Sequence, residues 1–204
     1  MIRIAAFASD WASSPFSHIE AGPWSATSRS AELIANAIRG LSADFVIAGD
    51  VAVHRSAEVE HGAVVKGPAI VGARSLVASG AYLRGGVFLG EACIVGPACE
   101  LKSTFMLRAS KIAHLSFVGD SILGTDVNVE AGAMVANFRN ELDDKRIRLV
   151  RLGETIDTGV EKFGALIGDG SRIGANAVIA PGAILEPGTR LARLGMIDQH
   201  PSRR

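Results

Sequence analysis

One spacing dominates the hydrophobic pattern of the chain: a branched aliphatic residue recurs at every sixth position through its middle. Ten successive slots carry it, namely Val53, Val59, Val65, Val71, Val77, Leu83, Leu89, Val95, Leu101 and Leu107. An α-helix repeats every 3.6 residues and a flat strand every two, so neither produces a period of six. A short fixed period with one obligatory apolar slot is typical of a left-handed parallel β-helix of hexapeptide repeats, with three hexapeptides per triangular coil. We therefore predict an all-β solenoid whose stacked coils bury these slots as one column.

The rhythm of six changes after this run. The step from Leu107 to Ile112 is five residues, and so is the step from Val118 to Leu123, before the sixes resume towards Val135. A repeat protein has no packing reason to shorten a repeat that it keeps elsewhere. We therefore expect the wall of the solenoid to be deformed here, and we expect the deformed stretch to carry a site.

The segments that lack the period of six define the remaining parts of the chain. Residues 1–48 are expected to cap the open first coil, with one helix over 29–39 whose apolar residues form a single stripe. The solenoid is expected to span 49–195. A charged insertion at 138–165 interrupts it, and its alternating residues favour a hairpin that is either part of a binding face or a solvated loop. Residues 196–204 are expected to form a frayed tail.

Composition and charge narrow the class of partner. The chain has 204 residues, and 21 Lys and Arg balance 21 Asp and Glu, so no net basic field attracts nucleic acid or anionic lipid. No window approaches the roughly 20 apolar residues of a membrane span, and the first eight residues make a poor signal peptide. Cys93 and Cys99 lie one hexapeptide apart, on different faces of a coil, so we expect no disulfide and a cytoplasmic location. The histidines show no metal-ligand spacing, so no metal site is expected.

Candidate chemistry lies near the register breaks. Arg84 and Lys102 are eighteen residues apart, which stacks them in adjacent coils about 4.8 Å from strand to strand. Two stacked cations repel unless an anion lies between them, which indicates a phosphate site; the alternative is that both side chains point into water. His114 lies inside the deformed stretch and is either a structural histidine or a general base. Strand alternation puts Glu100 on the same face as Lys102, where a carboxylate could orient an imidazole.

Three stretches carry a family resemblance: KIAHLSFVGD at 111–120, ILGTDVNVEAGAMVANF at 122–138 and EKFGALIGDGSRIGANAVIAPGAIL at 161–185. They resemble the acetyltransferase domain of bifunctional sugar-1-phosphate nucleotidylyltransferase/acetyltransferases, and the likeness runs from about Pro23 to Leu191. The register shift and the insertion fall in matching places. Nothing in this sequence resembles the Gly-rich nucleotide loop of the nucleotidylyltransferase domain, so we expect a stand-alone acyltransferase half.

The resemblance implies a role for individual residues. His114 matches the general base of acetyl transfer, and Glu100 matches the carboxylate that orients it. Substrate-binding roles are implied for Arg84 and Lys102 at the sugar phosphate, for Phe117, Asn128 and Asn137 at the sugar, and for Lys162 at the same phosphate, from its own or a neighbouring subunit. Contacts with the donor, acetyl-CoA, are implied for Ala131, Gly174 and Ala175.

The sequence departs from the family pattern in two places. Phe117 replaces a tyrosine, which removes one hydroxyl that would contact the substrate and can change selectivity strongly. Arg193 stands where a small residue is usual on the donor side.

Three functions remain open on this reading. The first is an acetyl-CoA-dependent N-acetyltransferase that acts on glucosamine or galactosamine 1-phosphate as a homotrimer. The second is an acyltransferase for another amine or hydroxyl acceptor, such as a nucleotide sugar. The third is a non-catalytic trimeric partner of a separate nucleotidylyltransferase.

Overall fold

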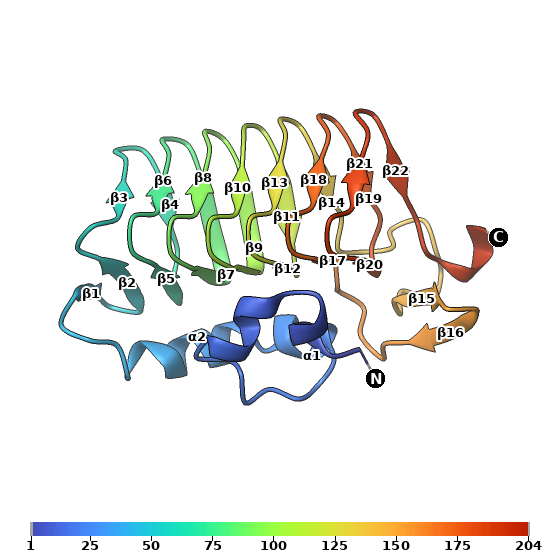
Figure 1. The fold of residues 1–204 in the computed structure, drawn as a ribbon, viewed down its shortest axis with the longest axis horizontal. Helices are drawn as coiled ribbons and strands as arrows, with labels where there is room; N and C mark the ends of the chain where they lie inside the picture. Colours follow the sequence, from blue (N-terminus) through green and yellow to red (C-terminus); the bar gives the residue numbers. More distant parts are fainter. Residues whose placement is uncertain (1, 204) are drawn as a thin grey trace.

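The computed structural model describes residues 2–203, and its main body is a solenoid of short parallel strands stacked along one axis (Figure 1). Each coil crosses three walls before the chain passes to the next coil. The first wall contains β4 (Val64–Val65), the start of β7 (Tyr82–Leu89), the start of β9 (Glu100–Met106), β11 (Phe117–Gly119), β14 (Met134–Val135), β19 (Val178–Ile179) and β22 (Met196–Ile197). The predicted β-helix is thus confirmed.

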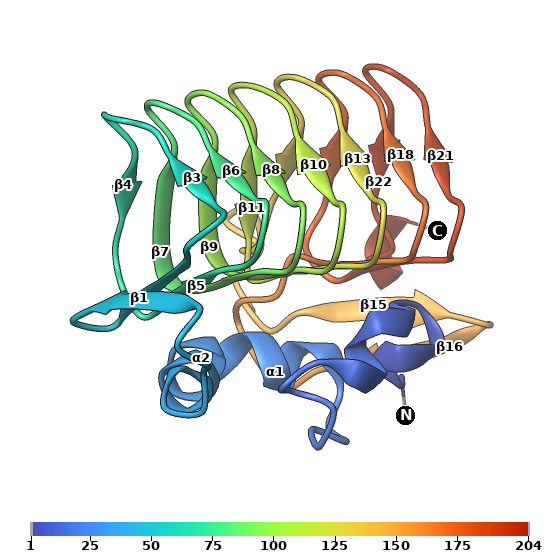
Figure 2. The same ribbon diagram turned by 60° about the vertical axis from the view of Figure 1, so that its left-hand side comes forward.

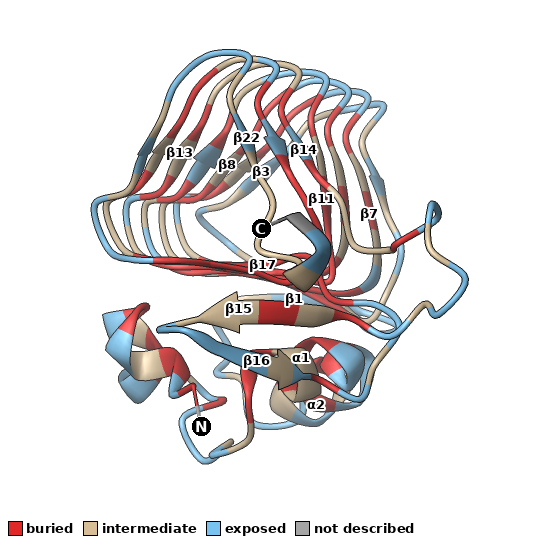
Figure 3. Cartoon of the chain, turned by 90° about the vertical axis from the view of Figure 1, so that its right-hand side faces the viewer, coloured by how far each residue is buried: buried red, intermediate tan, exposed pale blue. Residues whose placement is uncertain are grey.

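The other two walls complete the triangle seen along the axis (Figure 3). The second wall contains β2 (Val51–His54), β5 (Ala69–Val71), the ends of β7 and β9, β12 (Ile122–Leu123), β17 (Ala165–Ile167) and β20 (Ala183–Leu185). The third wall contains β3 (Glu58–Val59), β6 (Leu76–Val77), β8 (Ile94–Val95), β10 (Lys111–Ile112), β13 (Asn128–Val129), β18 (Arg172–Ile173) and β21 (Arg190–Leu191). Strands β7 and β9 run around a corner, so the first two walls form one sheet.

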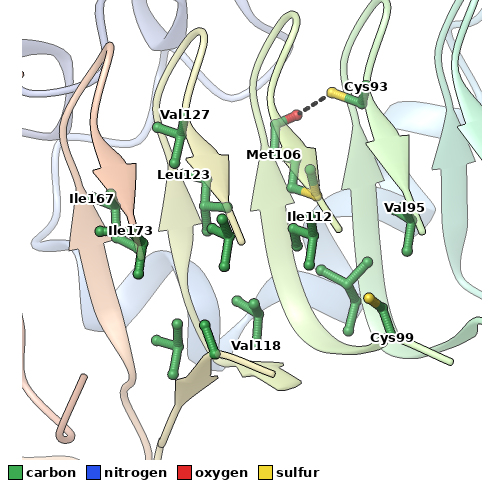
Figure 4. Packing of buried hydrophobic residues seen from close by; sticks show 14 of the residues in the cluster. Cys93, Val95, Cys99, Met106, Ile112, Val118, Leu123, Val127, Ile167 and Ile173 are labelled. Atoms are coloured by element: carbon green, nitrogen blue, oxygen red, sulfur yellow. Dashed lines mark hydrogen bonds between the residues drawn. The ribbon is translucent and has the colours of Figure 1, made fainter. Parts of the chain in front are cut away.

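The sixth-residue aliphatics fill the interior as one core, part of which is shown in Figure 4. One slot was predicted wrongly. Met106 pairs with both Leu89 and Leu123 and joins this core, whereas Leu107 points outward into a second cluster. The first five-residue step therefore runs from Leu101 to Met106, because strand β9 shortens where it turns the corner. Both short steps, and the insertion, then fall at the same corner, between the first and second walls.

The N-terminal segment covers a wall rather than the open first coil, so the predicted position of the cap is wrong. Helices α1 (Pro23–Ser28) and α2 (Ser30–Ile38), with the 3-10 turns η1 (Ile4–Ala6) and η2 (Ser9–Ser13), lie along the second wall (Figures 2 and 3). The physical reason is that the outward side chains of this wall are themselves apolar and need covering; they are Ala52, Ile70, Phe105, Ile122, Leu166 and Ile184. The helix expected over 29–39 is confirmed as α2.

A hairpin and the C-terminal tail complete the cover. The insertion forms β15 (Arg148–Arg151) and β16 (Glu154–Asp157), as predicted, and this hairpin also lies over the second wall (Figure 3). Strand β1 (Phe45–Ala48) pairs antiparallel with β2 at the other end. The solenoid continues through β22, past the expected end at 195.

The tail is not frayed over its described residues. It crosses the C-terminal end of the solenoid and ends in the 3-10 turn η3 (Pro201–Arg203). The Arg139 side chain, 2% exposed, donates hydrogen bonds to Asp198 at 2.6 and 3.0 Å and to the Pro181 carbonyl at 2.8 Å. The buried guanidinium therefore anchors the tail to the insertion.

Both cysteines are buried free thiols, as expected, and burial raises the pKa of Cys93 to about 12. No helix among residues 2–203 has the length and apolar character needed to cross a membrane.

Candidate functional site

A group of charged and polar side chains lines the corner where the solenoid wall shortens. We call it the corner cluster, and it consists of Arg84, Glu100, Lys102, Asp120 and Asn137. Arg84 and Lys102 pair in register in adjacent coils, which confirms the stacking expected from their spacing. Each cation also has a carboxylate partner: the Arg84 Nε lies 2.7 Å from Glu100, and the Lys102 Nζ lies 2.7 and 2.9 Å from the Asp120 oxygens. Asn137 donates to the same Asp120 carboxylate.

Asp120 is the centre of this cluster, and sequence reasoning missed it. Its side chain is 5% exposed, against 18% for Lys102, so the carboxylate depends on its partners for its charge to be stable. Its backbone has φ of +44°, its N–H donates to the Lys102 carbonyl at 2.7 Å, and its carbonyl accepts from Gly164. The eighteen-residue spacing did not locate it, because this coil is shortened and Lys102 pairs in register with Gly119, which leaves Asp120 at the turn that follows.

Phe117 and Lys162 border the corner cluster. Phe117 pairs with Glu100, and a Cβ placed on Gly119 would lie 2.8 Å from the Phe117 Cζ and 2.7 Å from the Asn137 amide. The tip of the ring is therefore close to Asn137, so a tyrosine hydroxyl at this position would point into the polar corner. Lys162 is exposed beside Phe163, whose N–H donates to the Asn137 carbonyl at 3.1 Å.

His114 lies at a different corner, where the third wall turns into the first. Backbone hydrogen bonds stack the turns there: Gly132 donates to the His114 carbonyl at 2.8 Å, and Asn176 donates to the Ala131 carbonyl at 2.9 Å. We call His114, Ala131, Ala175 and Arg193 the turn column, since one of them occupies this turn in each successive coil. The structure thus brings together His114 and two of the three expected donor contacts.

The expected contact between Glu100 and His114 does not form within residues 2–203. The Glu100 carboxylate accepts hydrogen bonds from Arg84, which lies in the preceding coil, and the His114 imidazole is exposed without a hydrogen-bond partner in the described chain. The reason is positional: Glu100 points out of the first wall, while His114 belongs to the turn before that wall.

A groove of about 680 Å³ lies on the third wall beside the turn column. It is lined by Asn128, Glu130, Arg172, Ile173, Gly174, Arg190, Leu191, Ala192 and Arg193. Asn128 and Gly174 therefore lie in this groove, and Asn128 is on a different wall from Asn137. Arg172 and Arg190 were missed, although they show the same eighteen-residue spacing and pair in register.

The charges of the groove are partly compensated. Arg172 donates to the Asp126 carboxylate at 2.6 Å, and Arg193 donates to Glu130 at 2.9 and 3.0 Å. Arg190 donates to the Gly170 carbonyl at 2.6 Å. The groove is therefore basic, because the Arg190 side chain has no carboxylate partner within residues 2–203.

In the described part of the chain, no three His, Cys, Asp or Glu side chains gather in a way that could hold a metal ion.

Comparison with curated proteins gives relatives that match part of this chain. A bifunctional sugar-1-phosphate nucleotidylyltransferase/acetyltransferase of Sulfurisphaera tokodaii is 43% identical over 83 residues, which are 41% of this chain and 20% of the relative. A bifunctional protein GlmU of Methanococcus vannielii is 40% identical over 83 residues, 41% of this chain and 19% of the relative. The chain spans about a fifth of the length of these curated relatives. No family model matches it.

The solved structures found by shape are more distant. One is a variant of AntD, an N-acyltransferase from Bacillus cereus, in complex with dTDP and coenzyme A, with a TM-score of 0.40 and 11% identity over 77% of this chain and 81% of that chain. Another is the acetyltransferase domain of PglB from Neisseria gonorrhoeae, with a TM-score of 0.28 and 20% identity over 52% and 57% of the two chains. These likenesses are too remote to locate a site. The resemblance seen in the sequence is confirmed by the curated relatives: over about 41% of its length this hexapeptide-repeat β-solenoid is similar to bifunctional sugar-1-phosphate nucleotidylyltransferase/acetyltransferases.

Proposed function

We propose that this protein is an acyl-CoA-dependent acyltransferase that acetylates the amine of an amino-sugar 1-phosphate, glucosamine or galactosamine 1-phosphate. The observation that carries the proposal is the corner cluster. Arg84 and Lys102 stack at the one corner where the wall is shortened, within a chain similar to sugar-1-phosphate nucleotidylyltransferase/acetyltransferases.

The corner cluster suits a sugar phosphate. A phosphate dianion accepts several charge-assisted hydrogen bonds, and Arg84 offers a guanidinium fork while Lys102 offers a point charge. Glu100 and Asp120 hold these two side chains in place, so a phosphate would bind the N–H donors of Arg84 and Lys102 that the carboxylates leave open, and little side-chain freedom would be lost. Lys162 adds an exposed ammonium near the same corner.

His114 suits the role of general base. Its imidazole is exposed at the turn before the first wall and makes no hydrogen bond within residues 2–203 that would occupy its nitrogens. Neutral His114 would accept the proton of the substrate amine as the amine attacks the acyl carbonyl, and the thiol of coenzyme A would leave. Backbone N–H groups of the turn column near Ala131 would stabilise the developing negative charge on the carbonyl oxygen.

The groove on the third wall fits an anionic acyl donor. Acetyl-CoA supplies an acyl group activated as a thioester, together with phosphates that need cationic partners. Three of the nine lining residues are arginines, and Gly174 is in the same groove. The site therefore offers separate positions for a sugar phosphate and for a nucleotide-bearing donor.

A homotrimer would place a second chain against the first wall. The outward row of this wall is mostly apolar, with Glu100 as its charged member; the exposed apolar residues in it include Val64, Met134, Val178 and Met196. Aligned apolar rows of this kind are typical of surfaces that oligomerisation buries. The corner cluster and the turn column flank this wall on its two edges, so a neighbouring chain would close the space between them.

The function is tested by thiol release from acetyl-CoA with glucosamine 1-phosphate and galactosamine 1-phosphate as acceptors. We expect His114→Ala to lose at least 100-fold in kcat, in the usual range for a general base. The matched control is His61→Ala, an exposed histidine at the equivalent turn of an earlier coil, which should keep its activity. Arg84→Ala should raise KM for the sugar phosphate. Unchanged turnover in His114→Ala would reject the assignment.

A second acceptor class is favoured by Phe117. Its ring tip reaches the polar corner without the hydroxyl of the family, so the site lacks one donor for a sugar. If neither amino-sugar phosphate is acetylated by a folded protein that binds coenzyme A, a screen of nucleotide-linked and other amine or hydroxyl acceptors would identify the alternative. If coenzyme A does not bind and a larger nucleotidylyltransferase chain co-purifies, a non-catalytic partner is the better description.

A further inference from the structure

The groove on the third wall already contains a negative charge from the protein itself. Glu130 is the one carboxylate among its nine lining residues. Its Oε2 accepts a hydrogen bond from the Ala175 N–H at 2.9 Å and another from the Arg193 Nε at 2.9 Å, while its Oε1 accepts one from the Arg193 Nη2 at 3.0 Å. This single side chain therefore reaches across two coils and holds one backbone donor and one cation of the turn column.

Both groups that Glu130 holds are ones that an anionic donor would use. Ala175 is a position at which the family resemblance implies a donor contact, and Arg193 is the most exposed member of the ion pair, with 74% of its side chain accessible against 37% for Glu130. The hydrogen bonds from Arg193 and then from Ala175 keep the pKa of Glu130 below its usual range, so the carboxylate is charged near neutral pH.

We propose that Glu130 is an internal competitor of the acyl donor: in the free protein its carboxylate occupies Arg193 of the groove and the N–H of Ala175 beside it, and it must swing away before coenzyme A binds. This inference rests on the proposed donor. When Glu130 leaves, Arg193 becomes available to the phosphates of the donor and the Ala175 N–H becomes available to a carbonyl oxygen. Binding of the donor is then coupled to the release of Glu130.

The chain provides a matched contact without these features. Glu60 accepts a hydrogen bond from the Ser79 N–H at 2.7 Å, which is the same carboxylate-to-turn contact near the other end of the solenoid. No arginine is paired with Glu60 in the described chain, and Glu60 does not line the groove. A carboxylate at this turn can thus stabilise the turn without pairing with a cation. Glu130 differs from Glu60 because it also pairs with Arg193 and lines the groove.

The expected effect follows from the fraction of molecules with an open groove. An apparent dissociation constant rises in inverse proportion to that fraction. An exposed ion pair with one additional backbone hydrogen bond favours the closed arrangement by a factor of about three to ten. Glu130→Gln keeps an oxygen that can accept from Ala175 but removes the charge that holds Arg193, so we expect it to bind coenzyme A about three- to tenfold more tightly.

The test is calorimetric titration of coenzyme A and of 3′,5′-ADP, which carries phosphates but no thiol arm, into the wild type and its variants. Tighter binding of both ligands by Glu130→Gln, with no change in Glu60→Gln, would support the proposal. The gain should disappear in the Glu130→Gln/Arg193→Ala double variant, because the released cation is what the phosphates bind. Glu130→Ala serves as a second variant if the first folds poorly by thermal melting.

The failure of this inference differs from the failure of the proposed function. If the wild type binds coenzyme A and Glu130→Gln binds it equally or more weakly, Glu130 is not a competitor, and the acyltransferase proposal stands. If neither protein binds coenzyme A, the donor assignment and the competitor role both fall.

Discussion

Replacing Lys102 by methionine would separate two tasks of this side chain. Lys102 stacks on Arg84 as part of the proposed phosphate site, and it also neutralises Asp120, whose side chain is 5% exposed. Methionine keeps much of the length and packing of lysine but removes the charge. The Asp120 carboxylate is then left with Asn137 as its side-chain partner.

The size of the effect follows from the burial of the pair. Removing one partner of a fully buried ion pair costs about 3–5 kcal/mol, because the other charge stays buried without compensation. Lys102 is 18% exposed and Asn137 still donates to Asp120, which lowers the expected loss to about 2 kcal/mol. Adding Asp120→Asn removes the orphaned charge, so the double variant should regain at least about 1 kcal/mol over the sum of the two single losses.

The assay combines denaturant unfolding with acetyl transfer. We expect Lys102→Met to lose both stability and activity, and we expect the double variant to recover stability while its KM for the sugar phosphate stays high. Recovery of stability without recovery of substrate binding would identify Lys102 as a phosphate ligand. Strictly additive losses, within about 0.5 kcal/mol, would refute the argument that Lys102 compensates a buried carboxylate.

Four further predictions concern other parts of the molecule. Arg139→Ala should lower the free energy of unfolding by about 3 kcal/mol, because it removes the buried guanidinium that makes two hydrogen bonds to Asp198, whose side chain is 6% exposed; urea unfolding and faster proteolysis of the tail would show it. Met134→Glu puts a further charge in the mostly apolar outward row of the first wall and should convert the proposed trimer into monomers in light scattering. Cys93 should resist thiol reagents at pH 8 in the native protein, since a pKa of about 12 leaves almost no thiolate, and should react after unfolding. Phe117→Tyr restores a hydroxyl at the polar corner and should lower KM for an amino-sugar phosphate about fivefold, the value of one hydrogen bond.

The sequence predicted the structure best at positions where the type of residue allows only one environment in the fold. An aliphatic slot every sixth residue has no better position than the interior of a coil, so the solenoid, its core from Val71 to Leu101 and the hairpin in the insertion were predictable. The slot at Leu107 was not, because Met106 and Leu107 are both apolar and both buried, and only the corner geometry decides which one points inward.

The sequence predicted which residues belong to the site better than it predicted the contacts among them. Spacing stacked Arg84 on Lys102 correctly. It did not show that each has a carboxylate partner, because Glu100 was assigned to His114 and Asp120 was read only as part of a motif. The choice between these partners depends on which side of a wall each residue faces. Adding or removing one residue in a turn changes the side that the following residues face.

The shortened corner gives a physical reason for the place of the cluster. In the coil of β7, the corner is made by Gly85 and Gly86, both with positive φ, and α2 lies so close that a Cβ on Gly86 would be 2.5 Å from the Ala31 nitrogen. In the next two coils a single residue with positive φ, Ser103 and then Asp120, makes the turn instead. Removing one residue draws successive corners inward and buries the Asp120 carboxylate, which would be costly without a cation in reach. Lys102 supplies that cation from the preceding coil, so the same deletion that deforms the wall also fixes the lysine that we expect to bind the phosphate.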